Sequence, residues 1–161
     1  MRIPLGHSLI KWLLKSNLVL GKRVVVMGAG LAGGELADFL MEKGKKVTIV
    51  TEQESMADGL GTMPILKEHL LEKLSASGCT MLSGAKYEKI KKEGLVITTK
   101  EGQSRTLEAD KIIYVAAVKQ NTEPFASFEK KIGEVDMAGD CVEPRGIMEA
   151  IHDGYRIGNE L

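Results

Sequence analysis

Two short apolar runs stand out in the first third of the chain. Residues 23–27 are Arg-Val-Val-Val-Met, and residues 46–50 are Lys-Val-Thr-Ile-Val. Such runs are typical of strands buried on both faces of a parallel sheet. Between them, apolar positions over 35–43 recur at helical spacing, and Gly44 follows as a helix stop signal. The pattern predicts a strand–helix–strand unit of about 30 residues.

The rest of the chain adds further helices and short strands. Three alternating segments separated by tight turns indicate an antiparallel meander. Residues 119–134 are polar and are expected to be irregular. The predicted helices are 65–75 and 147–161, and the predicted strands are 80–82, 85–90, 94–99, 104–107, 110–117 and 135–138. We therefore expect an α/β protein, with helices packed on a central parallel sheet and with an antiparallel β-meander.

The first twenty residues form a segment of their own. Leu9, Trp12, Leu13 and Ser16 recur at helical spacing, which favours a short amphipathic helix or linker over residues 1–20. Its apolar run is interrupted by lysines and is shorter than the roughly 20 residues that span a bilayer. We expect neither a signal peptide nor a membrane span here.

The charge balance narrows the classes of partner. The 161 residues include 22 Lys and Arg and 22 Asp and Glu, so the formal net charge is zero. This argues against nucleic acid and against an anionic membrane as partners. Cys79 and Cys141 form neither a CxxC pair nor a zinc-ligand spacing, so we expect reduced thiols, a cytoplasmic location and no metal site.

A glycine pattern links the first predicted strand to the first predicted helix. It runs Gly28-Ala29-Gly30-Leu31-Ala32-Gly33. In a strand–turn–helix setting, the first glycine allows a sharp turn, the second lets backbone approach a pyrophosphate, and the third lets the helix pack closely on the strand. The helix N-terminus then offers free N–H groups to the phosphates. The pattern predicts a dinucleotide site formed by residues 28–33.

An acidic residue follows the second strand at the expected distance. Glu52 lies 24 positions after Gly28, where a carboxylate can accept hydrogen bonds from the adenosine ribose. Thr51 is the alternative ribose contact, with Glu52 then turned to solvent. No Arg or Lys follows until Lys67, so no cation is expected near a 2′-phosphate. This favours NAD(H) over NADP(H).

Several segments together resemble a known family. Residues 28–35, 47–50, 138–147 and 149–155 are similar to the pyridine-nucleotide-dependent FAD oxidoreductases. Within them, the resemblance is to the reductase portion of the 2-enoate reductase, 2,4-dienoyl-CoA reductase and NADH:flavin oxidoreductase group. It implies a Rossmann-like FAD/NAD(P)-binding fold. Residues 21–120 would form an NAD(H)-binding domain, and 121–161 a C-terminal segment of an FAD-binding domain.

The same resemblance implies roles for residues outside the glycine turn. Asp140, after Gly139, corresponds to the residue on the flavin ribityl chain, and the backbone at Gly146 and Ile147 to that near the isoalloxazine. Glu35 corresponds to a glutamate near the nicotinamide. Ala116 and Ala117 correspond to a cofactor crossing, where Ala117 replaces a glycine of the family. From the residues alone, Gly139-Asp140 is as typical of a turn or a helix N-cap as of a flavin contact.

These features predict an NAD(H)-binding electron-input module that delivers hydride from NADH to FAD, as part of a larger enoate- or dienoyl-CoA-reductase-like enzyme. Its partners would be NAD(H), the remaining FAD and substrate domains, and a possible second copy. The chain has one dinucleotide pattern where a complete reductase unit needs two. No residue is a convincing catalytic acid, base or nucleophile. The alternative is a non-enzymatic nucleotide-sensing regulatory domain, which also starts from this glycine pattern.

Overall fold

A computed structural model describes residues 21–57, 64–116 and 118–160. The helix or linker predicted over residues 1–20 lies outside this range. The chain divides into two compact units, one ending at Val115 and the other beginning at Ala116. Each unit is described by itself below.

The first unit is built on a four-stranded sheet in which every neighbouring pair is parallel. Val24 of the central strand lies in register with Val47 on one side and Lys111 on the other. The strand order is β3-β2-β1-β7, with β1 at Arg23–Met27, β2 at Lys46–Val50, β3 at Thr80–Leu82 and β7 at Lys111–Tyr114. The predicted central parallel sheet is confirmed, although β7 is shorter than the predicted 110–117.

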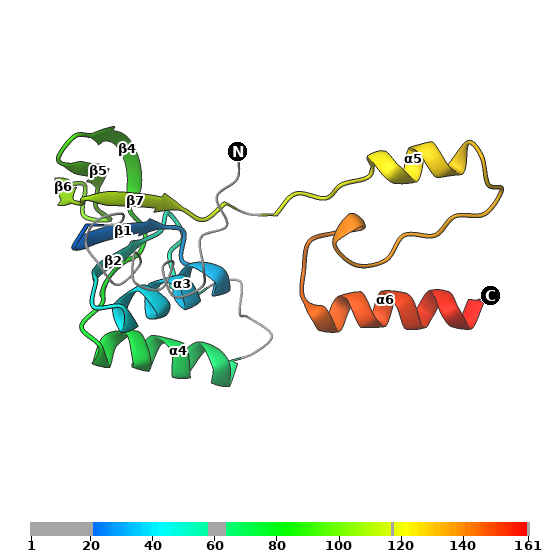
Figure 1. Ribbon diagram of the computed structural model, residues 1–161, viewed down its shortest axis with the longest axis horizontal. Helices are drawn as coiled ribbons and strands as arrows, with labels where there is room; N and C mark the ends of the chain where they lie inside the picture. The colour runs from blue at the N-terminus through cyan, green and yellow to red at the C-terminus, as the bar shows by residue number, and fades with distance from the viewer. Residues whose placement is uncertain (1–20, 58–63, 117, 161) are drawn as a thin grey trace, which may run out of the picture. The chain divides into compact units, whose positions relative to one another are not determined.

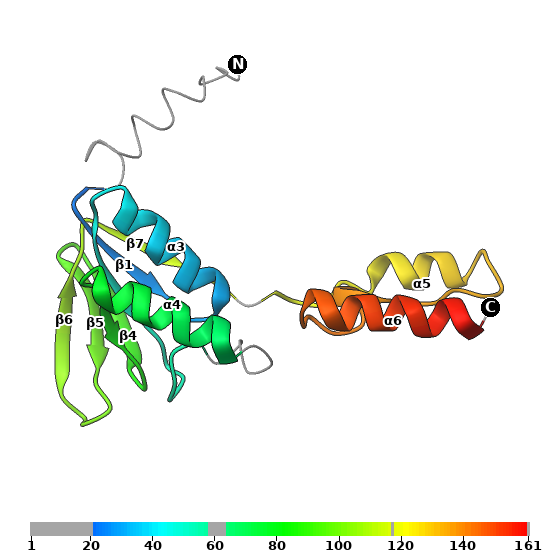
Figure 2. The ribbon, with the colours of Figure 1, turned by 90° about the horizontal axis from the view of Figure 1, so that it is seen from below.

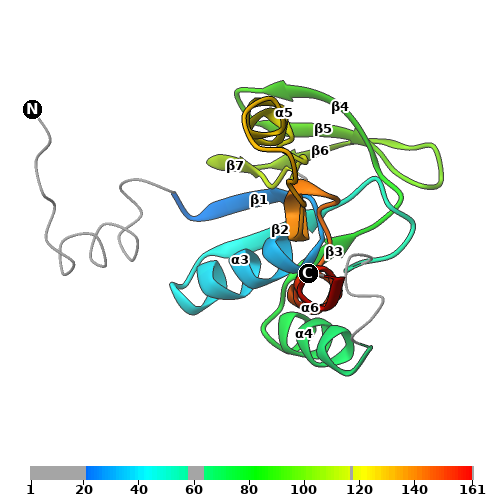
Figure 3. The same ribbon diagram turned by 90° about the vertical axis from the view of Figure 1, so that its right-hand side faces the viewer.

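Two further layers cover the sheet. Helices α3 and α4 lie on one side of it and the strands β4, β5 and β6 on the other (Figures 1 and 3). The meander is antiparallel throughout, as predicted. The bounds are Leu31–Glu42 for α3, Pro64–Ala76 for α4, Lys86–Lys91 for β4, Gly94–Thr98 for β5 and Ser104–Glu108 for β6.

The alternation of side chains along β1 explains the layering. Val24 and Val26 belong to the apolar cluster shared with α3 and α4, which lie in front of the sheet in Figure 2. Val25 and Met27 belong to a second cluster, shared with the meander. Because successive side chains of a strand point to opposite faces, an unbroken apolar run serves two cores at once.

The first helix starts earlier than predicted. Apolar periodicity placed its start at Glu35, whereas α3 begins at Leu31 and takes Gly33 and Gly34 into its first turns. Glycine has a low helix propensity, which hides this start from a pattern-based prediction. The end agrees with expectation: Gly44 follows the helix with φ +76°.

The second unit contains α5 at Glu123–Glu129, the 3₁₀-helix η2 at Gly139–Cys141 and α6 at Ile147–Glu160. The prediction of an irregular 119–134 was wrong only over Glu123–Glu129, where α5 forms. Pro124 lies in the first turn of this helix, and Asn121 Oδ1 accepts the Glu123 N–H at 3.3 Å. The strand predicted at 135–138 is also wrong. No strand of the described residues pairs with this segment, and a strand without a ladder is not stable.

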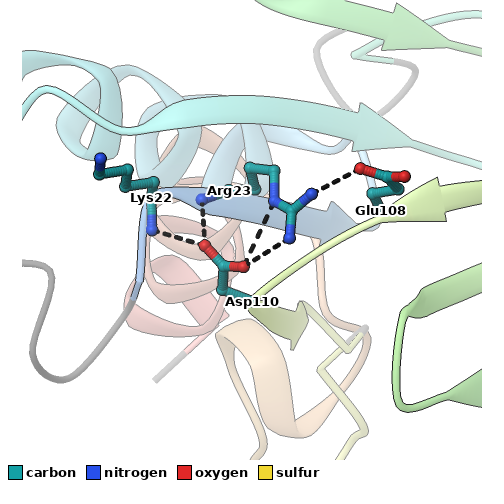
Figure 4. Close-up of polar contacts among 4 residues, drawn as sticks. All are labelled: Lys22, Arg23, Glu108 and Asp110. Carbon is teal, nitrogen blue, oxygen red and sulfur yellow. Dashed lines mark hydrogen bonds and ion pairs between the residues drawn. The ribbon is translucent and has the colours of Figure 1, made fainter.

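A carboxylate ties the start of β1 to the start of β7. Asp110 accepts the backbone N–H groups of Lys22 and Arg23 at 2.7 and 2.9 Å (Figure 4). The Arg23 guanidinium donates to the same carboxylate at 2.9 Å from Nη2 and pairs with Glu108 at 2.5 Å. These hydrogen bonds, first among them the Arg23 N–H, hold the pKa of Asp110 well below its usual range.

We expect Asp110→Asn to lower the free energy of unfolding at pH 7, because an uncharged amide accepts weaker bonds from Arg23. A depressed pKa stabilises the fold above the group's ordinary pKa, and this contribution is lost as the pH falls. Urea unfolding of wild type and variant should therefore converge as the pH drops from about 5 towards 2. Glu108→Gln, at a partner that is 71% exposed, is the control and should stay near wild type. If the variant were less stable than wild type by the same free energy of unfolding at pH 7 and at about pH 2, the charge argument would be wrong.

Candidate dinucleotide-binding site

The glycine turn joins β1 to α3 through two close backbone approaches. Gly28 has φ +105°, and a Cβ there would lie 2.6 Å from the Val115 carbonyl oxygen. A Cβ at Gly33 would collide with the carbonyl oxygen of Gly28. A larger residue at Gly28 would collide with the chain after β7 and would be strained by its positive φ, whereas a larger residue at Gly33 would push α3 away from the turn. The turn is therefore shaped by close packing at its first and third glycines.

The middle glycine differs, because it faces open space. A Cβ on Gly30 would meet nothing within 4 Å among the described residues. Gly30 is the N-cap of α3 and offers no side chain to the first-turn N–H groups, which belong to Leu31, Ala32 and Gly33. An uncapped helix N-terminus with free space before it suits an anion such as a pyrophosphate. Ala29, inside the turn, is buried and packs into the core on the helix side.

The carboxyl end of β2 presents one acidic side chain. Thr51 is 3% exposed, and its hydroxyl oxygen accepts the Gln53 N–H at 3.2 Å. Glu52 is exposed, and its Oε1 lies 3.4 Å from the Tyr87 backbone nitrogen that donates to it. Of the two ribose candidates, Glu52 is the accessible one, while Thr51 stabilises the loop.

The loop that follows β2 and carries Glu52, called the ribose loop below, has two lysines beside it. Both are distant from it in the sequence. Lys67 of α4 donates from Nζ to Ser55 Oγ at 3.1 Å. Lys100, in the turn after β5, forms an ion pair with Glu54. The premise that no cation lies near this loop was wrong, because the fold brings lysines from two other elements to it. The preference for NAD(H) therefore rests on Glu52.

Tyr87 of β4 is a site residue that the sequence did not indicate. Its hydroxyl donates to the Val50 carbonyl oxygen at 2.9 Å, and the Gly28 N–H donates to the same oxygen at 2.8 Å. Burial, and secondarily the charge of Glu52, raises the pKa of Tyr87, so its hydroxyl is protonated at neutral pH. A lone tyrosine in a charged strand carries no local signal for this role.

Among the remaining candidates, Glu35 and Ala116 face solvent. Glu35 is exposed on α3, and its carboxylate has no hydrogen-bond partner in the part of the chain that is described. Ala116 is exposed and belongs to the second unit. Ala117 lies outside the described residues.

In the second unit, the other four candidates lie on or beside η2 and the start of α6. Gly139, with φ +71°, donates its N–H to Asp153 Oδ2 at 3.0 Å, and Arg145 pairs with that carboxylate at 2.5 Å. These contacts fix η2 against α6. Asp140 is exposed, and no described residue bonds its carboxylate, which leaves both oxygens open to polyol hydroxyls.

Gly146 and Ile147 begin α6 and are both exposed. A Cβ on Gly146 would lie 2.7 Å from Glu149 Oε2, so that carboxylate lies over the start of the helix. A negative charge in the first turn is the arrangement that the helix dipole favours.

Comparison with known proteins identifies the family of this arrangement. Residues 10–142 match the family described as pyridine nucleotide-disulphide oxidoreductase. The chain belongs to this family. Oxidoreductases of this kind are α/β proteins of the Rossmann-like type, as the sheet and the glycine turn predicted.

Two curated relatives match most of the chain. It is 30% identical over 143 residues to an NADH oxidase of Thermoanaerobacter brockii, covering 87% of this chain and 21% of the relative. It is 31% identical over 142 residues to a bilirubin reductase of Mediterraneibacter gnavus, covering 86% and 21%. The chain thus spans about a fifth of the length of these relatives.

A solved structure, 2-naphthoyl-CoA reductase in complex with 2-naphthoyl-CoA, is similar with a TM-score of 0.76 and 26% identity, covering 88% of this chain and 21% of that one. The family and these relatives support the expected assignment to NAD(P)H-dependent flavin oxidoreductases, with NAD(H) and FAD as cofactors.

The family's description names disulphides, but the sequence has no closely spaced cysteine pair for thiol chemistry. Cys79 and Cys141 are the two cysteines of the chain, and burial raises the pKa of the Cys79 thiol. A raised pKa disfavours the reactive thiolate.

Among the described helices, none combines the length and apolar character needed to cross a membrane.

The two lysines beside the ribose loop yield a prediction. Replacing both, as Lys67→Ala with Lys100→Ala, removes two positive charges beside the loop and leaves Glu54 without its ion pair, so NADPH binding should weaken more than NADH binding. We expect the dissociation constant for NADPH, divided by that for NADH, to rise about two- to tenfold at low salt. Calorimetric titration with both nucleotides measures the ratio. Lys92→Ala, an exposed turn lysine of the meander, is the control, and an unchanged ratio in the double variant would rule out a role for these lysines.

Proposed function

We propose that this chain is the NAD(H)-binding electron-input module of a flavoprotein oxidoreductase, in which hydride passes from the nicotinamide to FAD. The observation that carries the proposal is the uncapped N-terminus of α3 behind the open Gly30. Family membership supports the oxidoreductase function over the nucleotide-sensing alternative. The larger protein we propose is a cytoplasmic, homo-oligomeric enzyme that resembles the enoate and dienoyl-CoA reductases.

The chain's own residues bind and orient. The first-turn N–H groups of α3 bind the pyrophosphate, and Glu52 accepts the ribose hydroxyls. Glu35, exposed further along α3, lies towards the nicotinamide. Bound NADH and FAD supply the redox chemistry, so the protein needs to provide position and electrostatics only. We assign no catalytic acid or base, and the substrate binds to domains beyond this chain.

For FAD, the proposed contacts are Asp140 with the ribityl hydroxyls and the backbone at Gly146 and Ile147 with the isoalloxazine. The free Asp140 carboxylate and the exposed start of α6 support them. A crossing contact at Ala116 and Ala117 completes the proposed set. Each follows from the resemblance stated above and awaits its own test.

Gly30→Val tests the nucleotide site. The valine fits the protein, since no described atom lies within 4 Å of its Cβ, but it enters the space needed by a pyrophosphate. We expect NADH binding to weaken at least a hundredfold in calorimetric titration, with thermal melting unchanged within a few degrees. Gly133→Val, at another glycine with open surroundings, is the control. Wild-type affinity in Gly30→Val would place the phosphate site elsewhere and overturn the proposal.

The single glycine pattern also makes a prediction for FAD. A dinucleotide is held largely through phosphates at a helix N-terminus, and this chain supplies one such pattern. The purified 161-residue chain should therefore be colourless and should not retain added FAD through gel filtration. Absorbance at 450 nm relative to 280 nm measures retention. A yellow protein with stoichiometric FAD would contradict this and indicate a second nucleotide site.

A further inference from the structure

We propose that Tyr87 is a positioning residue of the nucleotide site, holding from the meander both the phosphate-binding turn and the ribose-binding Glu52. The inference rests on the proposed function, because it concerns how this NAD(H) site is held in shape. Tyr87 does not itself touch the nucleotide in this proposal. It acts through two neighbours, one on each side of the site.

The hydroxyl acts on the phosphate side. The Val50 carbonyl, the last of β2, accepts two donors: the Gly28 N–H at 2.8 Å and the Tyr87 hydroxyl at 2.9 Å. A carbonyl oxygen has two lone pairs, so both are used. The pair fixes the end of β2 relative to the first glycine of the turn. Any movement of Val50 would be passed directly to Gly28.

The backbone of the same residue acts on the ribose side. The Tyr87 N–H donates to Glu52 Oε1 at 3.4 Å. The register of β4 against β5 shifts between Tyr87 and Lys89, an irregularity of the bulge type. Bulges re-aim strand residues and are common beside functional sites. Here the bulge lies next to the residue that joins both halves of the site.

Independent backbone bonds hold the loop in place when the hydroxyl is removed. The Ala85 N–H donates to the Thr51 carbonyl at 3.0 Å, and the Gly84 N–H donates to the Gln53 carbonyl at 2.7 Å. Val50 also keeps its bond from Gly28 without Tyr87. The fold and the course of the loop should therefore survive loss of the hydroxyl. Tyr87 is then no longer fixed to the end of β2, so its N–H holds Glu52 less precisely.

Tyr87→Phe removes only the bond from the hydroxyl to the Val50 carbonyl, and it keeps the ring and the backbone N–H that donates to Glu52. We expect the dissociation constant for NADH to rise about two- to tenfold, the effect of one hydrogen bond. The ratio of the NADPH to the NADH dissociation constant should fall towards one, because a loosely held Glu52 repels a 2′-phosphate less. Tyr155→Phe, at an exposed tyrosine of the second unit, is the matched control.

The ratio separates positioning from general destabilisation. Unfolded protein lowers the number of binding sites but leaves the ratio of the two affinities unchanged, so the readout holds even if Tyr87→Phe is less stable. In a Glu52→Gln background, Tyr87→Phe should no longer change the ratio, since the hydroxyl affects the choice between the nucleotides only through the charge of Glu52. This double-mutant cycle is measured by calorimetric titration with NADH and NADPH.

Distinct results overturn the two proposals. If the wild-type chain binds NADH but Tyr87→Phe has the wild-type affinity, or weakens both nucleotides equally, the positioning role is wrong and the proposed function stands. The positioning role is also wrong if Tyr87→Phe changes the ratio of the NADPH to the NADH dissociation constant equally in the wild-type and Glu52→Gln backgrounds. If the wild-type chain binds neither nucleotide, the proposed function fails, and the positioning role fails with it.

Discussion

The close approach of α3 to the turn at Gly28 is the constraint on which the nucleotide-binding unit depends. A single added carbon at Gly33 would collide with the Gly28 carbonyl, so the helix can start where it does only with glycine there. The neighbouring Gly34 packs against Leu70, where a Cβ would lie 2.6 Å from a side-chain methyl, and this brings α4 close to α3. The glycines thus set two helix positions as well as the phosphate turn. The positive end of the α3 dipole is thereby directed at the carboxyl edge of the sheet.

The meander contributes to both ends of the parallel sheet. At the amino end, Arg23 of β1 meets Glu108 at the end of β6 and Asp110 just before β7. At the carboxyl end, Tyr87 of β4 meets the last carbonyl of β2. Between these ends, Leu95 and Ile97 of β5 are buried against the face of the sheet that carries Val25. A meander packed in this way fixes the strand ends, and precise strand ends are what a preorganised nucleotide site requires.

Local patterns were sufficient to predict the sheet, the meander and the glycine turn, because each follows from neighbouring residues. The start of α3 was missed because glycine lowers the local helix signal although close packing requires it. Lys67, Lys100 and Tyr87 were missed for another reason: they reach the ribose loop only through tertiary contacts. The strand expected at 135–138 failed because a short extended segment does not form a strand without a partner.

The two units differ in how their helices gain stability. In the first unit, α3 buries Ala37 and Leu40 in a core that the unit itself supplies. In the second, α6 has large apolar side chains along one face that remain mostly exposed, with Ile147 at 81% and Tyr155 at 73%. An amphipathic helix in a protein is stabilised mainly by packing of its apolar face. The glycine turn therefore lies on a unit with its own core, whereas the flavin contacts proposed at Asp140 and Gly146 lie on a unit that buries little. This difference is in keeping with a chain that spans about a fifth of its relatives.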